Sequence, residues 1–468
     1  MLSEILSRLN PADKEIEWQQ SFAYLWSGSV ISQLGTTTAA VASPLLALTL
    51  SGSAVFAGWV AVAGTLPGVL LQLPAGFLVD RIRRRRRLMA LSQAIRLLSA
   101  LIFSISLFCS DVPHIFLLVA VTINGACTTV YSLAEVTSVR RMVPEKERNS
   151  AAAQDEARGH ISQVAGRSLG GYIFGIHHAL PYVFEAVTSF MTLITLVSMG
   201  PIRRAEPLPD HHHRPQKFSY HQISEVWQEI RGDVYLRQVL AVCATANLLL
   251  QAVNLLLLVE ARKAGYSSTE IGLLLASSGS FGILGSFVTA KWLTPEGENA
   301  RRTTTIGFVV WAALMLFVYV SPSPALGLVF WGMFSAVGAY INIALRCHQT
   351  AEIAEERLGR VISIGKFVTG SATALGALIA GYAVDCMEPR RILTITATVM
   401  ALTVVLVKRK SIHDKCRAAT SAIRDGIRNT GKKNPRLPQT SPHRELEPAP
   451  KPMATGAGEL PARLRREP

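Results

Sequence analysis

The chain has 468 residues, of which 49% are hydrophobic and only 17% are charged, and its mean hydropathy is +0.30. A soluble domain carries about 25% charged residues, so several soluble domains of this total size would need a more polar surface. The formal net charge is +15, and residues 408–468 hold 15 Lys and Arg against six Asp and Glu. This composition excludes a disordered, fibrous or ordinary cytosolic protein and indicates many membrane spans.

Apolar segments long enough to cross a bilayer recur along most of the chain. A transmembrane helix needs about 20 mostly apolar residues. The fifth such segment is among the most polar, because it contains Arg158 and Arg167. We predict an all-α membrane protein with twelve spans, at residues 22–50, 54–79, 88–110, 114–136, 157–177, 180–200, 237–260, 268–292, 303–321, 324–346, 361–385 and 391–407.

The loops between these segments alternate in charge. Loops on the same side as the N-terminus hold 22 Lys and Arg, whereas the loops on the opposite side hold four. Basic residues are concentrated in the cytoplasmic loops of membrane proteins. We therefore expect both termini to lie in the cytoplasm.

A long polar loop divides the spans into two sets of six. The segment from Gly76 to Arg83, after the second span, has a partial repeat from Gly285 to Lys291, after the eighth. Two related halves of this kind are typical of secondary transporters. We predict a cytoplasmic segment at 1–21, a six-helix bundle at 22–200, a cytoplasmic linker at 201–236, a second six-helix bundle at 237–407, and a basic, proline-rich cytoplasmic tail at 408–468.

Residues 76–85, between the second and third spans, read G-F-L-V-D-R-I-R-R-R. This segment resembles the signature loop of the major facilitator superfamily, G-x-x-x-D-R-x-G-R-R, with Arg83 in place of the second glycine. The resemblance implies two pseudo-symmetric six-helix bundles. It also implies that Asp80 holds the cytoplasmic side closed by capping a neighbouring helix and pairing with an arginine. The gating residues implied here are Gly76, Asp80, Arg81 and Arg84.

A second set of residues narrows the resemblance to one branch of that superfamily. These residues are Arg141-x-Val143-Pro144, Glu156-Ala157-Arg158, Gln163, Gly166, Gly170-Gly171 and Leu180-Pro181-Tyr182. They resemble the bacterial branch that contains the enterobactin exporter and the macrolide efflux pumps. The resemblance implies an efflux protein of the bacterial inner membrane that contributes to multidrug resistance.

Polar side chains follow one face of the first, fourth, seventh and tenth spans. Polar groups inside a membrane are costly unless they face a cavity or bond to another helix. The family resemblance implies that these four spans surround the central cavity. The mixture of amides, hydroxyls and aromatic rings favours an amphipathic small molecule. We predict a substrate cavity lined by Gln33, Thr37, Asn124, Thr128, Tyr131, Asn247, Gln251, Asn254, Trp331 and Asn342.

Proton coupling requires a carboxylate that alternates between its charged and neutral forms. Glu135, at the inner end of the fourth span, and Glu185, near the outer end of the sixth, are the two candidates. Glu135 has an alternative role as a structural partner of Arg140 or Arg158. We also predict that Glu156 and Arg158 form a gate pair on the cytoplasmic side.

Motifs for ATP hydrolysis, nucleophilic catalysis and paired metal ligands are absent from the sequence. We therefore expect no enzyme activity and no cofactor. The basic tail predicts contact with anionic lipids, and its lack of aromatic residues disfavours nucleic-acid binding. The sequence as a whole predicts a monomeric exporter that exchanges an amphipathic drug, antibiotic or siderophore for protons. An uptake symporter of the same fold and a non-transporting membrane sensor or anchor are the alternatives.

Overall fold

The computed structural model divides the chain into two compact units, Met1–Ile412 and His413–Pro468. All described residues belong to the first unit and almost all of them are helical. The predicted tail at 408–468 lies outside the described part of the chain, apart from Arg409. The structure describes residues 11–81, 85–109, 114–143, 148–199, 227–228, 230–292, 297–353, 355–407 and 409.

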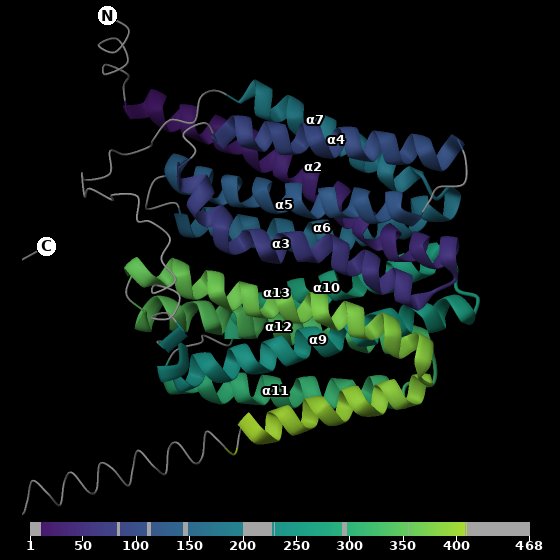
Figure 1. Cartoon of the computed structure of the whole chain (residues 1–468). Helices are drawn as coiled ribbons and strands as arrows, with labels where there is room; N and C mark the ends of the chain where they lie inside the picture. The colour runs from purple at the N-terminus through teal and green to yellow at the C-terminus, as the bar shows by residue number, and fades with distance from the viewer. Residues whose placement is uncertain are drawn as a thin grey trace, which may run out of the picture. The chain divides into compact units, whose positions relative to one another are not determined.

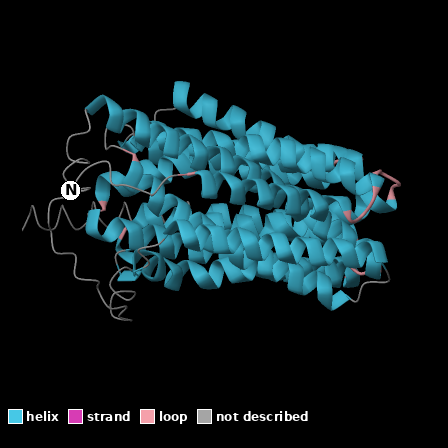
Figure 2. Ribbon diagram, turned by 90° about the horizontal axis from the view of Figure 1, so that it is seen from above, coloured by secondary structure: helices cyan, strands magenta, loops and turns pink. Residues whose placement is uncertain are grey.

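The helices lie side by side along one common direction, and Figures 1 and 2 show this alignment from two views. The first set contains α2 (Pro11–Ser51), α3 (Ala54–Arg81), α4 (Arg85–Cys109), α5 (His114–Met142), α6 (Arg148–Ile176) and α7 (Leu180–Ser198). The second set contains α9 (Val234–Lys263), α10 (Ser268–Trp292), α11 (Gly297–Val320), α12 (Pro324–Glu352), α13 (Glu355–Cys386) and a final helix at Pro389–Val407.

These twelve long helices correspond to the twelve predicted spans. Within the described residues, eleven helices are long and apolar enough to cross a membrane, and α6 falls below that standard. The sequence of α6 explains the exception, because Arg158 and Arg167 interrupt its apolar face. The second set begins slightly earlier than predicted, since α9 starts at Val234. Residues 201–226 and 229 of the predicted linker lie outside the described part of the chain.

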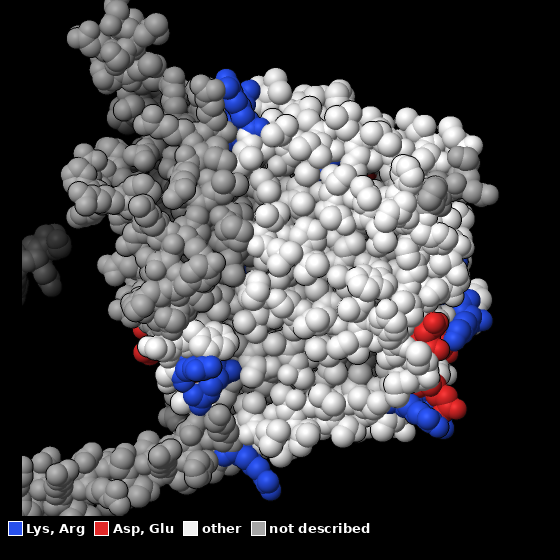
Figure 3. Space-filling model, viewed as in Figure 1, with Lys and Arg blue, Asp and Glu red and all other residues white. Residues whose placement is uncertain are grey.

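The outer surface of the bundle is apolar where the helices face away from one another. On α4, the side chains of Leu98, Ile102 and Ile105 are 59%, 61% and 58% exposed. Figure 3 shows a broad uncharged surface with Lys, Arg, Asp and Glu near its ends. A soluble protein rarely exposes so large an apolar surface, whereas a lipid bilayer covers it. The multi-pass membrane arrangement predicted from the sequence agrees with this surface.

Glycines allow the helices to approach closely in the absence of a hydrophobic driving force within lipid. Inside the first set, a Cβ added to Gly125 of α5 would lie 2.2 Å from the backbone oxygen of Gly64 in α3. Between the two sets, Gly171 of α6 packs against Gly272 of α10, where an added Cβ would lie 2.7 Å from the Cα atom. The two halves therefore touch through backbone atoms.

The contact between α3 and α13 repeats this arrangement on the other side of the bundle. A Cβ added to Gly58 would lie 3.1 Å from the Cα atom of Gly381. Both cross-half contacts lie near the end of the bundle that is opposite Pro11 and Val407. In the predicted orientation this is the extracellular end, so the halves are in close contact there.

The start of the second set is fixed by Asp233, which caps α9. Its carboxylate accepts hydrogen bonds from the amides of Tyr235 and Leu236, at 2.9 and 3.1 Å, and contacts His348 Nε2 of α12 at 2.5 Å. Burial alone would raise the pKa of Asp233, but these hydrogen bonds hold it below its usual value. Asp233 thus ties the first turn of α9 to the last turns of α12.

The close approach of α3 and α5 predicts a large effect from one added methyl group. We expect Gly125→Ala to destabilise the protein by about 1–3 kcal/mol, because the new Cβ meets backbone that cannot rotate away. Gly232→Ala is the matched control, since a Cβ there would meet nothing within 4 Å. Thermal unfolding of the purified proteins in detergent measures both effects. Equal unfolding midpoints for the two variants would contradict the packing described for Gly125.

Candidate functional site

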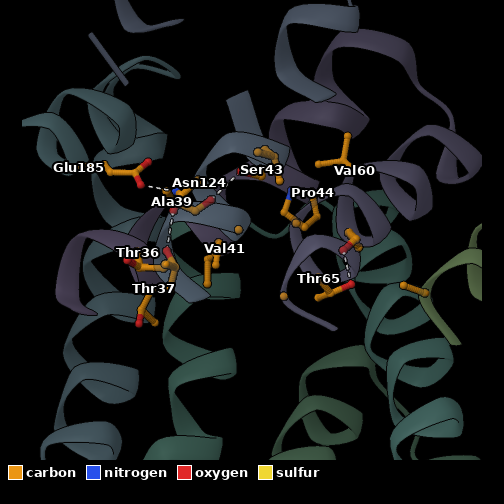
Figure 4. A pocket seen from close by; sticks show the side chains of 18 of the residues that line it. Thr36, Thr37, Ala39, Val41, Ser43, Pro44, Val60, Thr65, Asn124 and Glu185 are labelled. Atoms are coloured by element: carbon orange, nitrogen blue, oxygen red, sulfur yellow. Dashed lines mark hydrogen bonds between the residues drawn. The ribbon is translucent and has the colours of Figure 1, made fainter. Parts of the chain in front are cut away.

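A cavity of about 740 Å³ lies between the two sets of helices. Every helix from α2 to α7 contributes lining residues, as do α9, α10, α12 and α13. This volume is in the range of sites for drug-sized molecules, which is about 300–1,000 Å³. Figure 4 shows part of its lining, with Thr36, Asn124 and Glu185 close together and Ser43 and Pro44 further along.

The structure brings together most of the residues predicted from the four polar faces. Seven of the ten predicted residues line the cavity: Gln33, Thr37, Asn124, Thr128, Gln251, Asn254 and Trp331. Of these, Asn254 has a buried Oδ1 atom that accepts no hydrogen bond. Such an oxygen is available to a donor on a bound molecule, because leaving it unpaired is costly.

The other three predicted residues lie outside the lining of this cavity. Tyr131 is buried in a cluster with Leu25 and Met89, and its hydroxyl lies 2.9 Å from Ser29 Oγ. The polar face of α5 that contains Tyr131 thus extends beyond the cavity into the packed interior of the protein. Asn342 is exposed and Asn247 is partly buried, both outside the lining. Helical spacing identifies a shared face but not how far a cavity extends along it.

An ion pair between α4 and α7 lies at the wall of the cavity. Arg96 Nη2 and Glu185 Oε1 are 3.2 Å apart, and their side chains are only 1% and 5% exposed. Asn124 donates a further hydrogen bond to the same carboxylate oxygen. Arg96 also donates to Ser32 Oγ at 2.8 Å and to Thr36 Oγ1 at 2.6 Å. Four helices therefore meet at this one polar cluster.

The sequence-based reasoning identified Glu185 but missed Arg96. The available signal was an arginine near the middle of the third predicted span, three residues after Gln93. A charge in that position is costly in lipid and requires a partner. Arg96 is among the largest fully buried side chains of the described residues. The partner lies 89 residues away along the chain, so that spacing alone could not identify it.

Arg167 of α6 reaches across the cavity to the other half of the protein. Its Nη1 donates to the backbone oxygen of Leu275 at 3.0 Å and to Ser278 Oγ. Its guanidinium carbon lies 5.7 Å from the centre of the Trp331 ring, within the range of a cation–π interaction. The indole of Trp331 is itself held by a hydrogen bond to Leu250 O at 3.3 Å.

The predicted gate and coupling residues are only partly described. Arg158 pairs with Glu135 at 2.5 Å, and both side chains are about nine-tenths buried. This contact matches the alternative structural role of Glu135 and joins α5 to α6 within one half. The other predicted gating residues lie outside the part of the chain whose side chains are described: Gly76, Asp80, Arg81, Arg84 and Glu156.

The family model of the Major Facilitator Superfamily matches residues 25–377. The chain belongs to the major facilitator superfamily. It is therefore a membrane transporter and not an enzyme. The sequence is 24% identical over 382 residues to the multidrug efflux pump Tap of Mycolicibacterium fortuitum, and the match covers 78% of this chain and 88% of that protein.

Solved structures of transporters share this fold at low sequence identity. The nucleoside transporter NupG superimposes with a TM-score of 0.62 at 11% identity, covering 84% of this chain and 99% of that one. A bacterial homologue of the lysosomal transporter Spinster, in an inward-facing state, gives a TM-score of 0.60 at 13% identity, with 84% and 95% covered. These similarities establish the fold of this superfamily member.

The burial of Arg96 and Glu185 predicts strong coupling between them. Removing one partner of a buried ion pair leaves an uncompensated charge and costs about 3–5 kcal/mol. We expect Glu185→Gln alone to destabilise the protein more than Arg96→Gln combined with Glu185→Gln, since the double variant leaves no unpaired charge. Thermal unfolding of the four proteins of this double-mutant cycle provides the test. Additive effects would show that the two side chains do not interact.

Proposed function

We propose that this transporter is a proton-coupled exporter of amphipathic small molecules, which operates by alternating access. The cavity between the two halves, with a buried carboxylate in its wall, is the observation that carries the proposal. Rocking of two related halves around a central site is the common mechanism of this architecture. The efflux activity in the name of the Mycolicibacterium fortuitum relative supports the outward direction.

The lining of the cavity supports an amphipathic substrate. Alanine, valine and leucine side chains alternate with the amides and hydroxyls already described, and Phe103, Tyr182 and Trp331 add aromatic surface. Ligand sites of this kind use apolar area for affinity and a few polar groups for orientation. We infer that a molecule with an aromatic body and a few polar groups occupies this cavity.

Glu185 is our choice for the proton-coupling residue. It lines the cavity, whereas Glu135 is outside the lining and is paired with Arg158. The charged and titratable groups around Glu185 are Arg96, Tyr182 and Cys127. Protonation of Glu185 would break its ion pair and leave Arg96 held by Ser32, Thr36 and Gln93. Exchange of a proton here would thus change the contacts among several helices of the first half.

The membrane placement belongs to the same proposal. We propose that the chain lies in the bacterial inner membrane with both termini in the cytoplasm and works as a monomer. The gate residues predicted from the signature loop, including Asp80, and the pair Glu156 and Arg158 remain proposals for the cytoplasmic side. Anionic lipids are the partner that we propose for the basic tail.

Export of a neutral amphipathic dye provides the functional test. We expect bacterial cells that produce the wild type to accumulate about one-tenth, or less, of the amount of Nile red that cells with an empty vector accumulate. A protonophore should abolish this difference, because the proposed export requires the proton gradient. We expect Glu185→Gln to accumulate dye to the level of the empty vector. Fluorescence of washed cells measures the accumulated dye.

The controls separate loss of coupling from loss of folding. Glu388→Gln carries the same substitution at an exposed acid, 74% accessible, and should export as well as the wild type. The double variant with Arg96→Gln removes the unpaired charge and should fold yet remain inactive. Export that persists in Glu185→Gln and still responds to the protonophore would refute the role of Glu185. Dye accumulation that is equal in all cells, with normal protein levels, would argue against export.

A further inference from the structure

The charges that line the cavity do not balance. The lining contains three charged residues, Arg96, Glu185 and Arg167. Arg96 and Glu185 neutralise each other at 3.2 Å. Arg167 contacts a backbone oxygen, a serine hydroxyl and an aromatic ring, and has no acidic partner among the described residues. Among the described residues, the lining of the cavity therefore carries one positive charge without an acidic partner.

The position of that charge is well suited to hold a ligand. Arg167 is anchored through Nη1 alone, so its Nη2 and Nε donors make no hydrogen bond to any described residue. The guanidinium of Arg167 presents planar donors that match a carboxylate or a phosphate. Arg167 is partly buried, a counter-charge would stabilise its guanidinium, and an anion bound in the cavity would supply that counter-charge.

We propose that the cavity binds substrates that carry an anionic group, and that Arg167 is the residue that holds this group. The inference rests on the proposed function and specifies amphipathic organic anions as the substrates that the cavity binds most tightly, ahead of neutral molecules such as Nile red. The apolar wall of the cavity accommodates the remaining aromatic or aliphatic part. Arg167 acts as a specificity-determining residue, since a neutral analogue of the same shape leaves the guanidinium without a counter-charge.

Two probes of matched shape test the charge preference. Dansylglycine carries a carboxylate, and dansylglycinamide replaces it with a neutral amide. We expect the purified protein in nanodiscs to bind dansylglycine about tenfold more tightly or better, because a hydrogen bond to a charged group contributes more than one to a neutral group. Equilibrium titrations followed by dansyl fluorescence give both affinities.

Variants at Arg167 connect this preference to the residue. Arg167→Gln should reduce the affinity ratio of the two probes to about one, mainly by weakening dansylglycine binding. Arg167→Lys keeps the cation and should retain a reduced preference. Arg390→Gln, at an exposed position near the start of the final helix, is the matched control and should leave the ratio unchanged. Thermal unfolding of each variant verifies that it is folded.

Each outcome either supports the inference or overturns it. A preference that disappears in Arg167→Gln and persists in Arg390→Gln supports it. Equal binding of the two probes by the wild type, binding of neither, or a preference that survives Arg167→Gln overturns it. Proton-dependent export of neutral Nile red together with no charge preference would overturn only this inference. Arg167-dependent binding of the anion without export of any dye would overturn the proposed export instead.

Discussion

The interior of a membrane protein has to satisfy every polar group without help from lipid. In this chain the buried ion pair between Arg96 and Glu185 is the clearest result of that constraint. The pair, with Asn124 and Thr36, joins α2, α4, α5 and α7 into one unit. An apolar core in the same place would hold the helices without charge burial. The retained polar cluster instead puts an ionisable group at the wall of the cavity.

The two halves contribute different kinds of side chain to the cavity. The charged residues of the lining all come from the first half, on α4, α6 and α7. The second half contributes amides, apolar side chains and the ring of Trp331. Arg167 crosses this boundary, with hydrogen bonds to α10 and a ring contact to α12. In the proposed alternating-access mechanism, movement of one half relative to the other would break these contacts and would link events in the cavity to the arrangement of the halves.

Close helix packing forms the contact between the two halves. Gly171 with Gly272, and Gly58 with Gly381, bring backbones of the two halves together on opposite sides of the cavity. Small residues let the backbones of packed helices approach closely at such contacts. Each half is also fastened internally, by Glu135 with Arg158 in the first and by Asp233 with His348 in the second. Each half thus has an internal polar contact of its own, in addition to the contacts between the halves.

The sequence by itself determined the fold class, the approximate number of long helices and the family, and it predicted a division into two halves. These features depend on hydrophobic segment length and on a local motif, which are local properties of a chain. Helical spacing also identified seven lining residues, because it determines which side chains share a face. Only the tertiary structure decided where the cavity ends, so that Tyr131 is packed in a core. It likewise decided that Arg96 partners Glu185 and that Arg167 has no acidic partner among the described residues. Ion pairs between residues that are far apart in the sequence depend on how the helices pack, and residue spacing does not predict them.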